Sequence, residues 1–391
     1  MASAELTERL KAQAALLGFD RVGIAPAVSP PDHGHFLAWL KAGHAAGMEY
    51  MRRHAQARSH PDHVLAGVRS VVMASLLYRS DTAVSSEPRS GSGKVARYAR
   101  GVDYHEVLKD KLGALLDWLR TERPQTRGRA VTDTVPLLER DFARLAGLGW
   151  IGKNTMLINP KLGSFTFLGA LLVDCELTPD TPFEADHCGT CTRCLDACPT
   201  DAFVAPYQLD ARRCLSYWTI EHRGAIEASV AKSLDGWVFG CDLCQDVCPW
   251  NRKAPPGRLP EFQDRSEWVE PDLIEWLDRD AAAWQAALRN SALARAGRVG
   301  LVRTAALVLG QKRLESATPA LGRRLADHDE DPVIRAASAW ALGQIGTDDA
   351  RQYLLENQSS DDPTVREAVA SALVTIKTSR TSGEPGGDNP A

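Results

Sequence analysis

Eight of the nine cysteines fall into two blocks and one linking position, and this spacing constrains the fold more than any other feature of the chain. The first block, C-x2-C-x2-C-x3-C-P, consists of Cys188, Cys191, Cys194 and Cys198. The second block lacks the first cysteine of that pattern and consists of Cys241, Cys244 and Cys248, again followed by proline. Cys214 lies between the blocks and can supply the missing thiolate. The pattern is typical of proteins that hold two [4Fe–4S] clusters.

In two-cluster ferredoxins the cysteine before the proline ligates the other cluster, so the spacing predicts how the thiolates divide. We expect one cluster to be held by Cys188, Cys191, Cys194 and Cys248. We expect the second to be held by Cys198, Cys214, Cys241 and Cys244. Paired zinc sites leave the C-x3-C-P ends unexplained, and a disulfide framework does not suit a long chain without an export signal. Cys175 is expected to be a buried structural thiol.

Composition restricts the remaining function classes. A chain of 391 residues can form two or three domains, and 44% hydrophobic with 25% charged residues is ordinary for a globular protein. No apolar stretch approaches a membrane span, and reduced cysteines favour the cytoplasm. The net charge of −4 argues against a uniformly basic surface but permits a local basic patch. No coiled-coil pattern or dimer seam is evident, so we expect a monomer.

The first ~180 residues predict a mixed α/β domain. The β-branched and apolar segments 68–78, 131–133 and 165–173 predict strands. A helix is expected after Asp103, which can cap it, because leucines then recur on one face. Another helix is expected to start after Pro136 and to run to about Ala146, ending at Gly147.

Diverged helical repeats are expected near the C-terminus. Asp331-Pro332 recurs as Asp362-Pro363, and Arg335 recurs as Arg366, both at a spacing of 31 residues. This favours a short HEAT-like array, with an ordinary helical bundle as the alternative. The predicted fold class is therefore a multidomain α+β protein: an N-terminal α/β domain, a ferredoxin-like module for two [4Fe–4S] clusters, and HEAT-like helical repeats.

The corresponding domain boundaries follow the composition. The α/β domain is expected over 1–182, the cluster module over 183–251, a linker with helices over 252–297, the repeats over 298–378 and a disordered tail over 379–391. The linker contains a run of prolines between positions 255 and 271.

Two further features of the first domain bear on function: a glycine motif and Asp133. Gly147, Gly149 and Gly152 form G-x-G-x-x-G, but the motif follows a helix instead of a strand, which argues against a dinucleotide site. A helix C-cap or a turn beside a planar cofactor fits better. Asp133 follows a predicted strand, where a carboxylate can act as a general acid, although spacing alone favours a helix N-cap.

Several segments in this order closely resemble the epoxyqueuosine reductase family. They are YARGVDYH (98–105), TDTVPLLER (132–140), AGLGWIGKNTMLI (146–158), the cysteine blocks, and RCLSYWTIEHRG (213–224). The resemblance extends to about residue 378 and includes the repeats.

The resemblance implies an oxidoreductase that binds cobalamin and reduces epoxyqueuosine at the wobble position of tRNA to queuosine. It implies that Asp133 is the proton donor and that Tyr104, His105 and Arg140 line the substrate pocket. It implies cobalamin contacts by Tyr98, Asp133, Asn154, Leu157, Ser216, Cys241, Asp242 and Leu243. The two [4Fe–4S] clusters would pass electrons from an external low-potential donor.

Two alternatives remain at this point. A cobalamin-dependent reductive dehalogenase or corrinoid-activating reductase would share the cluster half. An electron-transfer adaptor without catalysis would not explain the N-terminal motifs. Binding to tRNA needs basic contacts, for which the sequence offers Arg52, Arg53, Arg58, Arg223, Lys253, Arg323, Arg324 and Arg335.

Overall fold

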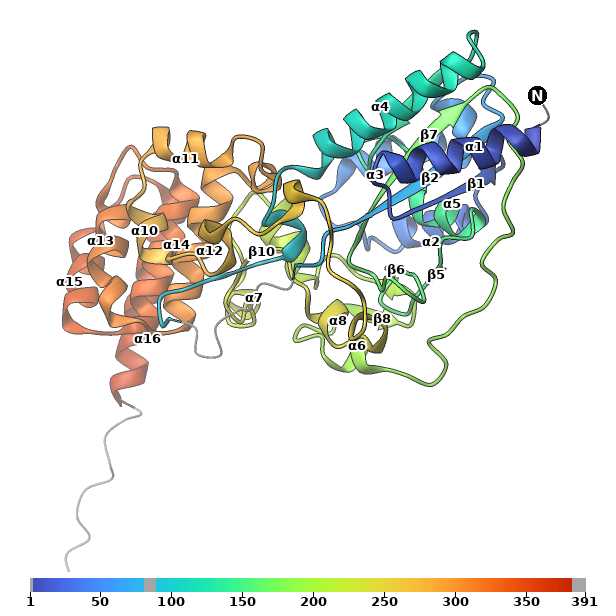
Figure 1. The fold of residues 1–391 in the computed structure, drawn as a ribbon. Helices are drawn as coiled ribbons and strands as arrows, with labels where there is room; N and C mark the ends of the chain where they lie inside the picture. Colours follow the sequence, from blue (N-terminus) through green and yellow to red (C-terminus); the bar gives the residue numbers. More distant parts are fainter. Residues whose placement is uncertain (1–2, 81–88, 382–391) are drawn as a thin grey trace, which may run out of the picture. The chain divides into compact units, whose positions relative to one another are not determined.

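The computed structural model describes residues 3–80 and 89–381, which divide into two compact units (Figure 1). The first unit consists of Met1–Thr82, Arg97–Cys214 and Asp242–Asp264. The second consists of Ala83–Ala96, Leu215–Cys241 and Arg265–Ala391. The cysteine-rich segment contributes to both units. The finer domain boundaries expected from the sequence stay predictions.

A four-stranded sheet forms the centre of the first unit. Its strand order is β1 (Arg21–Pro26), β2 (Ser70–Leu77), β7 (Thr166–Val173) and β4 (Gly128–Val131), and all neighbours are antiparallel. The register between β2 and β7 runs from Ser70 opposite Val173 to Leu77 opposite Thr166. Every residue of β2 is buried, which explains why its sequence is a continuous apolar run.

Helices cover both faces of this sheet. On one face, α1 (Ser3–Leu16) and α4 (Tyr104–Glu122) pack against alternate strand residues such as Val72 and Leu76 (Figure 1). On the other face, α5 (Glu139–Leu145) packs near Val71 and Met73. The two-residue periodicity of a strand directs these side chains to opposite faces. The first unit also contains α2 (His33–Lys41) and α3 (Glu49–Arg53).

The long helix α4 begins as its sequence predicts. The Asp103 carboxylate accepts a hydrogen bond of 3.0 Å from the backbone N–H of His105, which satisfies one donor of the first turn. Val107, Leu108, Leu112, Leu115, Leu116 and Leu119 are buried. The predicted cap and apolar face are both confirmed.

The segment containing Asp133 differs from the prediction. Strand β4 ends at Val131 instead of reaching Asp133, and α5 begins at Glu139 instead of following Pro136 directly. Two tight turns replace the expected elements: the N–H of Thr134 donates to the carbonyl of Thr132, and that of Leu137 donates to the carbonyl of Val135. Because the N–H of Leu137 is turned back to Val135, the chain is not helical there, and the helix starts only at Glu139.

The glycine-rich segment is a turn that follows α5. Gly147 has φ of 74°, and its N–H donates to the carbonyl of Arg144, as in a helix C-cap. A Cβ on Gly149 would lie 2.2 Å from the carbonyl oxygen of Ile158, so this glycine serves close backbone packing. The helix C-cap interpretation is therefore confirmed.

Short elements surround the cysteines. In the first unit they are β5 (Trp150–Ile151), β6 (Leu157–Ile158), α6 (Arg193–Asp196), β8 (Phe203–Ala205), β9 (Gln208–Leu209) and α8 (Leu243–Asp246). In the second unit they are β3 (Lys94–Val95), the π-helical turn η4 (Tyr217–Glu221), α7 (Ala228–Ala231) and β10 (Trp237–Phe239). Strands β3 and β10 pair in parallel.

The rest of the second unit is helical. Helix α12 packs on α14, and α14 packs on α16, with α13 and α15 between them in the chain. The α-helices after residue 264 are α9 (Ser266–Val269), α10 (Leu273–Asp278), α11 (Ala281–Leu288), α12 (Gly297–Gln311), α13 (Thr318–Ala326), α14 (Pro332–Ile345), α15 (Asp348–Glu356) and α16 (Pro363–Thr381). Because α16 continues to Thr381, the first three residues of the predicted tail are helical. Positions 382–391 lie outside the described residues.

The recurring Asp-Pro pairs are helix starts. Asp331 accepts a hydrogen bond from the N–H of Val333 at the start of α14, and Asp362 accepts one from the N–H of Thr364 at the start of α16. The proline follows at the first helical position, where its missing N–H costs nothing. The arginine four residues after each aspartate donates to backbone carbonyls of the preceding segment. The predicted helical repeat array is confirmed.

Two of the arginines predicted to contact RNA are buried inside the protein. Arg335 is only 4% exposed and donates to the carbonyl of Leu325, and Arg58 is 8% exposed beside the ring of Phe36. Both serve internal packing. Across the described ranges, no helix is long and apolar enough to cross a bilayer.

Two glycines allow the repeats to approach closely. A Cβ on Gly310 would lie 2.5 Å from the Cα of Ala341, and one on Gly343 would lie 2.7 Å from the Cβ of Ala372. We expect Gly343→Ala and Gly310→Ala each to lower the free energy of unfolding by roughly 1–3 kcal/mol through overpacking. Calorimetric unfolding of the purified protein measures this.

Gly113 in α4 provides the matched control. A Cβ there meets no atom within 4 Å, so Gly113→Ala should stabilise the helix by roughly 0.5–1 kcal/mol. If Gly343→Ala behaved like Gly113→Ala, the close packing of α14 on α16 would be disproved.

Candidate active site and cysteine clusters

The Asp133 carboxylate is held by two side chains of helix α4 although Asp133 itself lies in a loop. One carboxylate oxygen accepts a short hydrogen bond from the Tyr104 hydroxyl. The other lies 2.7 Å from Nε2 of His105. Tyr104 and His105 are the first two residues of α4, so the cap by Asp103 also positions them. The Asp133 side chain remains 47% exposed and can therefore meet a ligand.

His105 lies between two carboxylates. Its Nδ1 is 2.6 Å from Asp103, and its Nε2 is 2.7 Å from Asp133. Burial alone would lower the pKa of His105, but hydrogen bonds to the two carboxylates raise it to about 10. His105 is consequently an imidazolium at neutral pH. Its positive charge lowers the pKa of Asp133 against the opposing effect of burial, so Asp133 is ionised in the resting protein.

Tyr104 lies in an aromatic layer. Its ring stacks on Phe167 of β7 with centroids 4.4 Å apart and planes inclined by 8°, and Tyr98 meets it edge-on at 6.2 Å. Burial and the neighbouring Asp133 carboxylate raise the pKa of Tyr104 far above its usual range. Tyr104 therefore remains a neutral phenol that donates to Asp133.

Glu139 fixes the backbone of the Asp133 loop. The Asp133 N–H donates a hydrogen bond of 2.7 Å to the Glu139 carboxyl. Desolvation and the adjacent Asp133 carboxylate raise the pKa of Glu139 to about 8. Arg140 follows in α5 with an exposed side chain, and it interacts electrostatically with Glu139, Cys244 and Tyr78. All four residues expected at the substrate pocket thus belong to one unit, and Asp133, Tyr104 and His105 are in direct contact.

The four cysteines expected to hold the first cluster lie together. Cys194 interacts electrostatically with Cys188, Cys191 and Cys248, although the segment 199–247 separates Cys248 from the others in sequence. Burial raises the pKa of the Cys248 thiol, and Cys188 and Cys191 raise it further. Within residues 3–80 and 89–381, no three His, Cys, Asp or Glu side chains converge on one metal ion. The ligands of a [4Fe–4S] cluster need not converge on one ion, because each thiolate binds a different iron.

The second set of cysteines is divided between the units. Cys198, Cys214 and Cys244 belong to the first unit, and Cys241 is the last residue of its segment in the second. The Cys198 sulfur accepts a hydrogen bond of 3.3 Å from the N–H of Ala202. Such N–H donors stabilise thiolates that ligate a cluster. Cys175 packs against the core of the first unit but is only partly buried, whereas the sequence predicted a buried thiol.

The side chains expected to contact cobalamin are mostly engaged within the protein. Asn154 is buried, donates to the carbonyl of Cys244 at 3.2 Å and accepts from the N–H of Met156. Leu157 is buried in the core. Asp242 is 1% exposed and accepts two hydrogen bonds from Arg97. Leu243 and Ser216 are partly buried at the starts of α8 and η4.

The donor set fits a cobalamin that receives no protein imidazole. His105 lies at the site, but both of its ring nitrogens are occupied by Asp103 and Asp133. Tyr98, Asp133 and Arg140 offer an aromatic edge, a half-exposed carboxylate and a guanidinium to a ligand. Any contacts that Asn154 and Asp242 made with such a cofactor would have to come from their backbone groups, because their side chains are engaged within the protein.

Two functional groups were missed in the sequence. Asp103 is the expected helix cap, but its carboxylate also accepts a hydrogen bond from the His105 ring. The sequence Asp-Tyr-His, which places the two residues two positions apart at a helix start, is the signal for this contact. Glu139 lies in the TDTVPLLER motif, which by itself assigns it no separate role. Its contact with the Asp133 N–H depends on the turns at Thr134 and Leu137, which the sequence pattern does not specify.

The cysteine arrangement predicts the metal content of variants. Reconstituted protein should contain about eight irons per chain. Cys214→Ala should lose part of this iron because it removes an expected ligand, whereas Cys175→Ala should keep all of it. Iron analysis and electron paramagnetic resonance measure both. Full iron content in Cys214→Ala, or loss in Cys175→Ala, would contradict the ligand assignment.

Family models match three parts of the chain. Residues 187–251 match a 4Fe-4S double cluster binding domain, residues 58–134 match epoxyqueuosine reductase QueG, and residues 291–374 match HEAT repeats. The chain is 39% identical to the epoxyqueuosine reductase of Xanthomonas campestris, over 86% of this chain and 96% of the relative. It is 38% identical to that of Pseudomonas aeruginosa, over 88% and 95%.

Solved structures agree over nearly the whole length. A crystal structure of epoxyqueuosine reductase with an epoxyqueuosine-modified tRNA-Tyr stem loop has a TM-score of 0.90 and 30% identity, covering 95% of this chain and 99% of that one. A Bacillus subtilis epoxyqueuosine reductase with an aspartate catalytic loop swung out of its active site has a TM-score of 0.88, 29% identity and the same coverage. These matches place the chain in the epoxyqueuosine reductase family.

Proposed function

We propose that this chain reduces the epoxide of epoxyqueuosine in tRNA to give queuosine, with the Asp133 site as the centre of proton transfer. Its family membership supports the reaction. The observation that carries the site assignment is the contact of Asp133 with both Tyr104 and His105. Conversion of an epoxide to an alkene and water consumes two electrons and two protons, so a site for proton delivery is required.

Asp133 is the proton donor to the departing oxygen, and His105 is its proton source. Asp133 is ionised in the resting protein, whereas His105 carries a proton on the nitrogen that faces it. When the carbon–oxygen bond breaks, negative charge develops on the oxygen and raises its basicity. A proton can then pass from His105 through the Asp133 carboxylate to that oxygen. Asp103 stabilises the imidazolium and keeps it oriented.

The other residues orient and shield this transfer. Tyr104 donates to Asp133 and is fixed by stacking on Phe167, so the carboxylate has a defined direction. Glu139 fixes the loop through the Asp133 N–H. Arg140 lies beside the pocket with an exposed cationic group that can bind substrate.

Cobalamin bound at this site would supply the strong two-electron reductant, and [4Fe–4S] clusters can have the low potential needed to reduce it. The residues that would face it are Tyr98, Asp133, Asn154, Leu157, Ser216, Cys241, Asp242 and Leu243. An external low-potential donor and a monomeric cytoplasmic enzyme complete the proposal. Family membership favours this reaction over reductive dehalogenation, corrinoid activation or electron transfer alone.

The Asp133 role is tested by Asp133→Asn, which keeps the shape of the side chain and its contact with Tyr104. We expect turnover of an epoxyqueuosine stem-loop to fall by roughly 10²-fold or more, because general acid catalysis is lost. Iron and cobalamin content should not change. Turnover close to that of the unchanged protein at saturating RNA would exclude Asp133 as proton donor.

The role of His105 predicts a shift in pH dependence. Asp103 raises the pKa of His105, so Asp103→Asn should lower that pKa from about 10 toward its ordinary value. The charged imidazole is present below its pKa and lost above it. The alkaline limb of the kcat profile should therefore move to lower pH in Asp103→Asn. An unchanged alkaline limb would separate His105 from proton transfer. Glu106→Gln, an exposed neighbour on α4, serves as the control.

A further inference from the structure

Four rings lie beside the cysteines expected to hold the first [4Fe–4S] cluster. They belong to Trp150, Phe183, His187 and Trp250, and each contacts at least two of the others. The centroids of contacting rings are between 4.9 and 5.8 Å apart. We call this set the ring shell. None of the four residues is among those assigned to cobalamin, to the clusters or to catalysis.

The ring shell packs against two of the expected cluster ligands. Trp150 is only 2% exposed and shares a buried apolar group with Cys248. Cys188, Phe183 and Trp250 pack against this group. The rings therefore cover the side of the cysteine set that Cys188 and Cys248 form.

The loop that carries the first three cysteines is otherwise open to solvent. The residues between these cysteines, which are Gly189, Thr190, Thr192 and Arg193, are all exposed. A cluster held here would lie close to the protein surface. Its contact with water is consequently limited by the apolar side chains packed against its ligands, and the ring shell supplies them.

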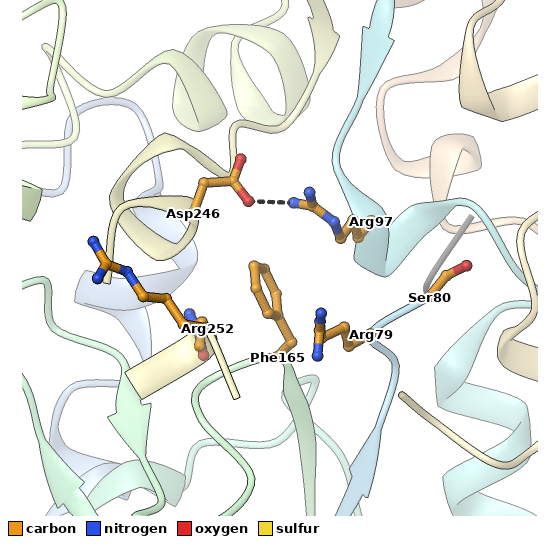
Figure 2. Close-up of a pocket in the computed structure, with 7 residues that line it drawn as sticks. Arg79, Ser80, Arg97, Phe165, Asp246 and Arg252 are labelled. Atoms are coloured by element: carbon orange, nitrogen blue, oxygen red, sulfur yellow. Dashed lines mark hydrogen bonds and ion pairs between the residues drawn. The ribbon is translucent and has the colours of Figure 1, made fainter. Parts of the chain in front are cut away.

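The position of Trp250 is fixed by its neighbour in the chain. The buried Asn251 side chain donates to the Ser164 hydroxyl at 3.0 Å and to the carbonyl of Gln245 at 2.7 Å. The next residue, Arg252, lines a separate polar cavity of about 300 Å³ (Figure 2). Trp250 packs among the rings instead, so its side chain can be shortened while the anchor at Asn251 remains.

Backbone donors to the ligand sulfur would also survive such a change. Burial raises the pKa of the Cys248 thiol, whereas hydrogen bonds from the backbone N–H groups of Trp250 and Asn251 lower it. Hydrogen bonds to ligand sulfurs are one determinant of cluster potential, and solvent exposure is another. Substitution of the Trp250 ring keeps the backbone N–H groups and changes only the exposure.

We propose that the ring shell lowers the reduction potential of the first [4Fe–4S] cluster by keeping water away from it. Reduction adds one electron, taken from the external donor, to a cluster whose thiolate ligands already make it anionic. Water would stabilise the added charge, so an apolar wall disfavours reduction and lowers the potential. The proposal rests on the clusters of the proposed function, which must reach a low potential there.

Trp250→Ala is the principal test, and Phe183→Leu is a milder second variant. Both are made in the full chain with reconstituted clusters. Midpoint potentials of the two clusters are measured by redox titration followed by electron paramagnetic resonance, together with iron content. We expect one midpoint potential to rise in each variant. In Trp250→Ala the reduced form should gain roughly tenfold, which corresponds to about 59 mV for one electron.

Two further variants separate the ring from general packing. Trp250→Phe keeps an aromatic ring and should have potentials close to those of the unchanged protein. Trp118→Ala is the matched control, because this tryptophan is also partly buried in the first unit. Among the described residues it packs against the core around α4, in which none of the eight expected ligands lies. Both potentials should stay unchanged in Trp118→Ala.

The proposal is overturned if Trp250→Ala and Phe183→Leu keep both potentials of the unchanged protein, or if Trp118→Ala shifts them equally. If Trp250→Ala loses iron, the milder Phe183→Leu decides. Turnover and iron content of the unchanged protein are measured separately. Absence of turnover with about eight irons per chain would reject the proposed reaction but not the role of the ring shell. Absence of cluster iron would reject both.

Discussion

The convergence of Cys188, Cys191, Cys194 and Cys248 is the constraint on which the rest of the first unit depends. It requires the chain to return after the segment 199–247 and to place α8 beside the first cysteine block. The returning segment is anchored by the buried network of Ser164, Gln245 and Asn251. From the same segment Asp242 and Asp246 bind Arg97, which directly precedes Tyr98. The cysteine module therefore also orders the backbone next to the aromatic wall of the catalytic site.

The Asp133 site combines a rigid support with an accessible carboxylate. Tyr104 and His105 are fixed at the start of a capped helix, and Tyr104 also stacks on Phe167 of the sheet. Asp133, in contrast, is a half-exposed residue of a loop. The pKa of Asp133 is lowered and that of His105 is raised, so their charged forms attract each other at neutral pH. The same attraction holds the loop toward α4. In the proposed mechanism, proton transfer to a substrate would neutralise His105 and thereby weaken this attraction.

The sequence predicted those features that depend on local chemistry. Cysteine spacing predicted two cluster sites, and the Asp-Pro pairs predicted helix starts that the structure confirms at Asp331 and Asp362. Features that depend on tertiary contacts were not predictable in the same way. The contact of Glu139 with the Asp133 N–H needs two specific turns, and burial of Arg335 depends on how α14 packs on its neighbours. The ligand roles of individual cysteines and cobalamin contacts stay predictions.

The arginines illustrate why a protein with a net charge of −4 can still bind a polyanion. Several of those noticed in the sequence serve the fold: Arg324 pairs with Glu330, Arg323 with Asp278, and Arg223 donates to backbone carbonyls. Their charges are neutralised or committed to main-chain groups. Arg252 differs because, within residues 3–80 and 89–381, its exposed guanidinium forms no hydrogen bond or ion pair. Net charge and the density of arginine in the sequence are therefore poor guides to which guanidinium groups remain available to a polyanion.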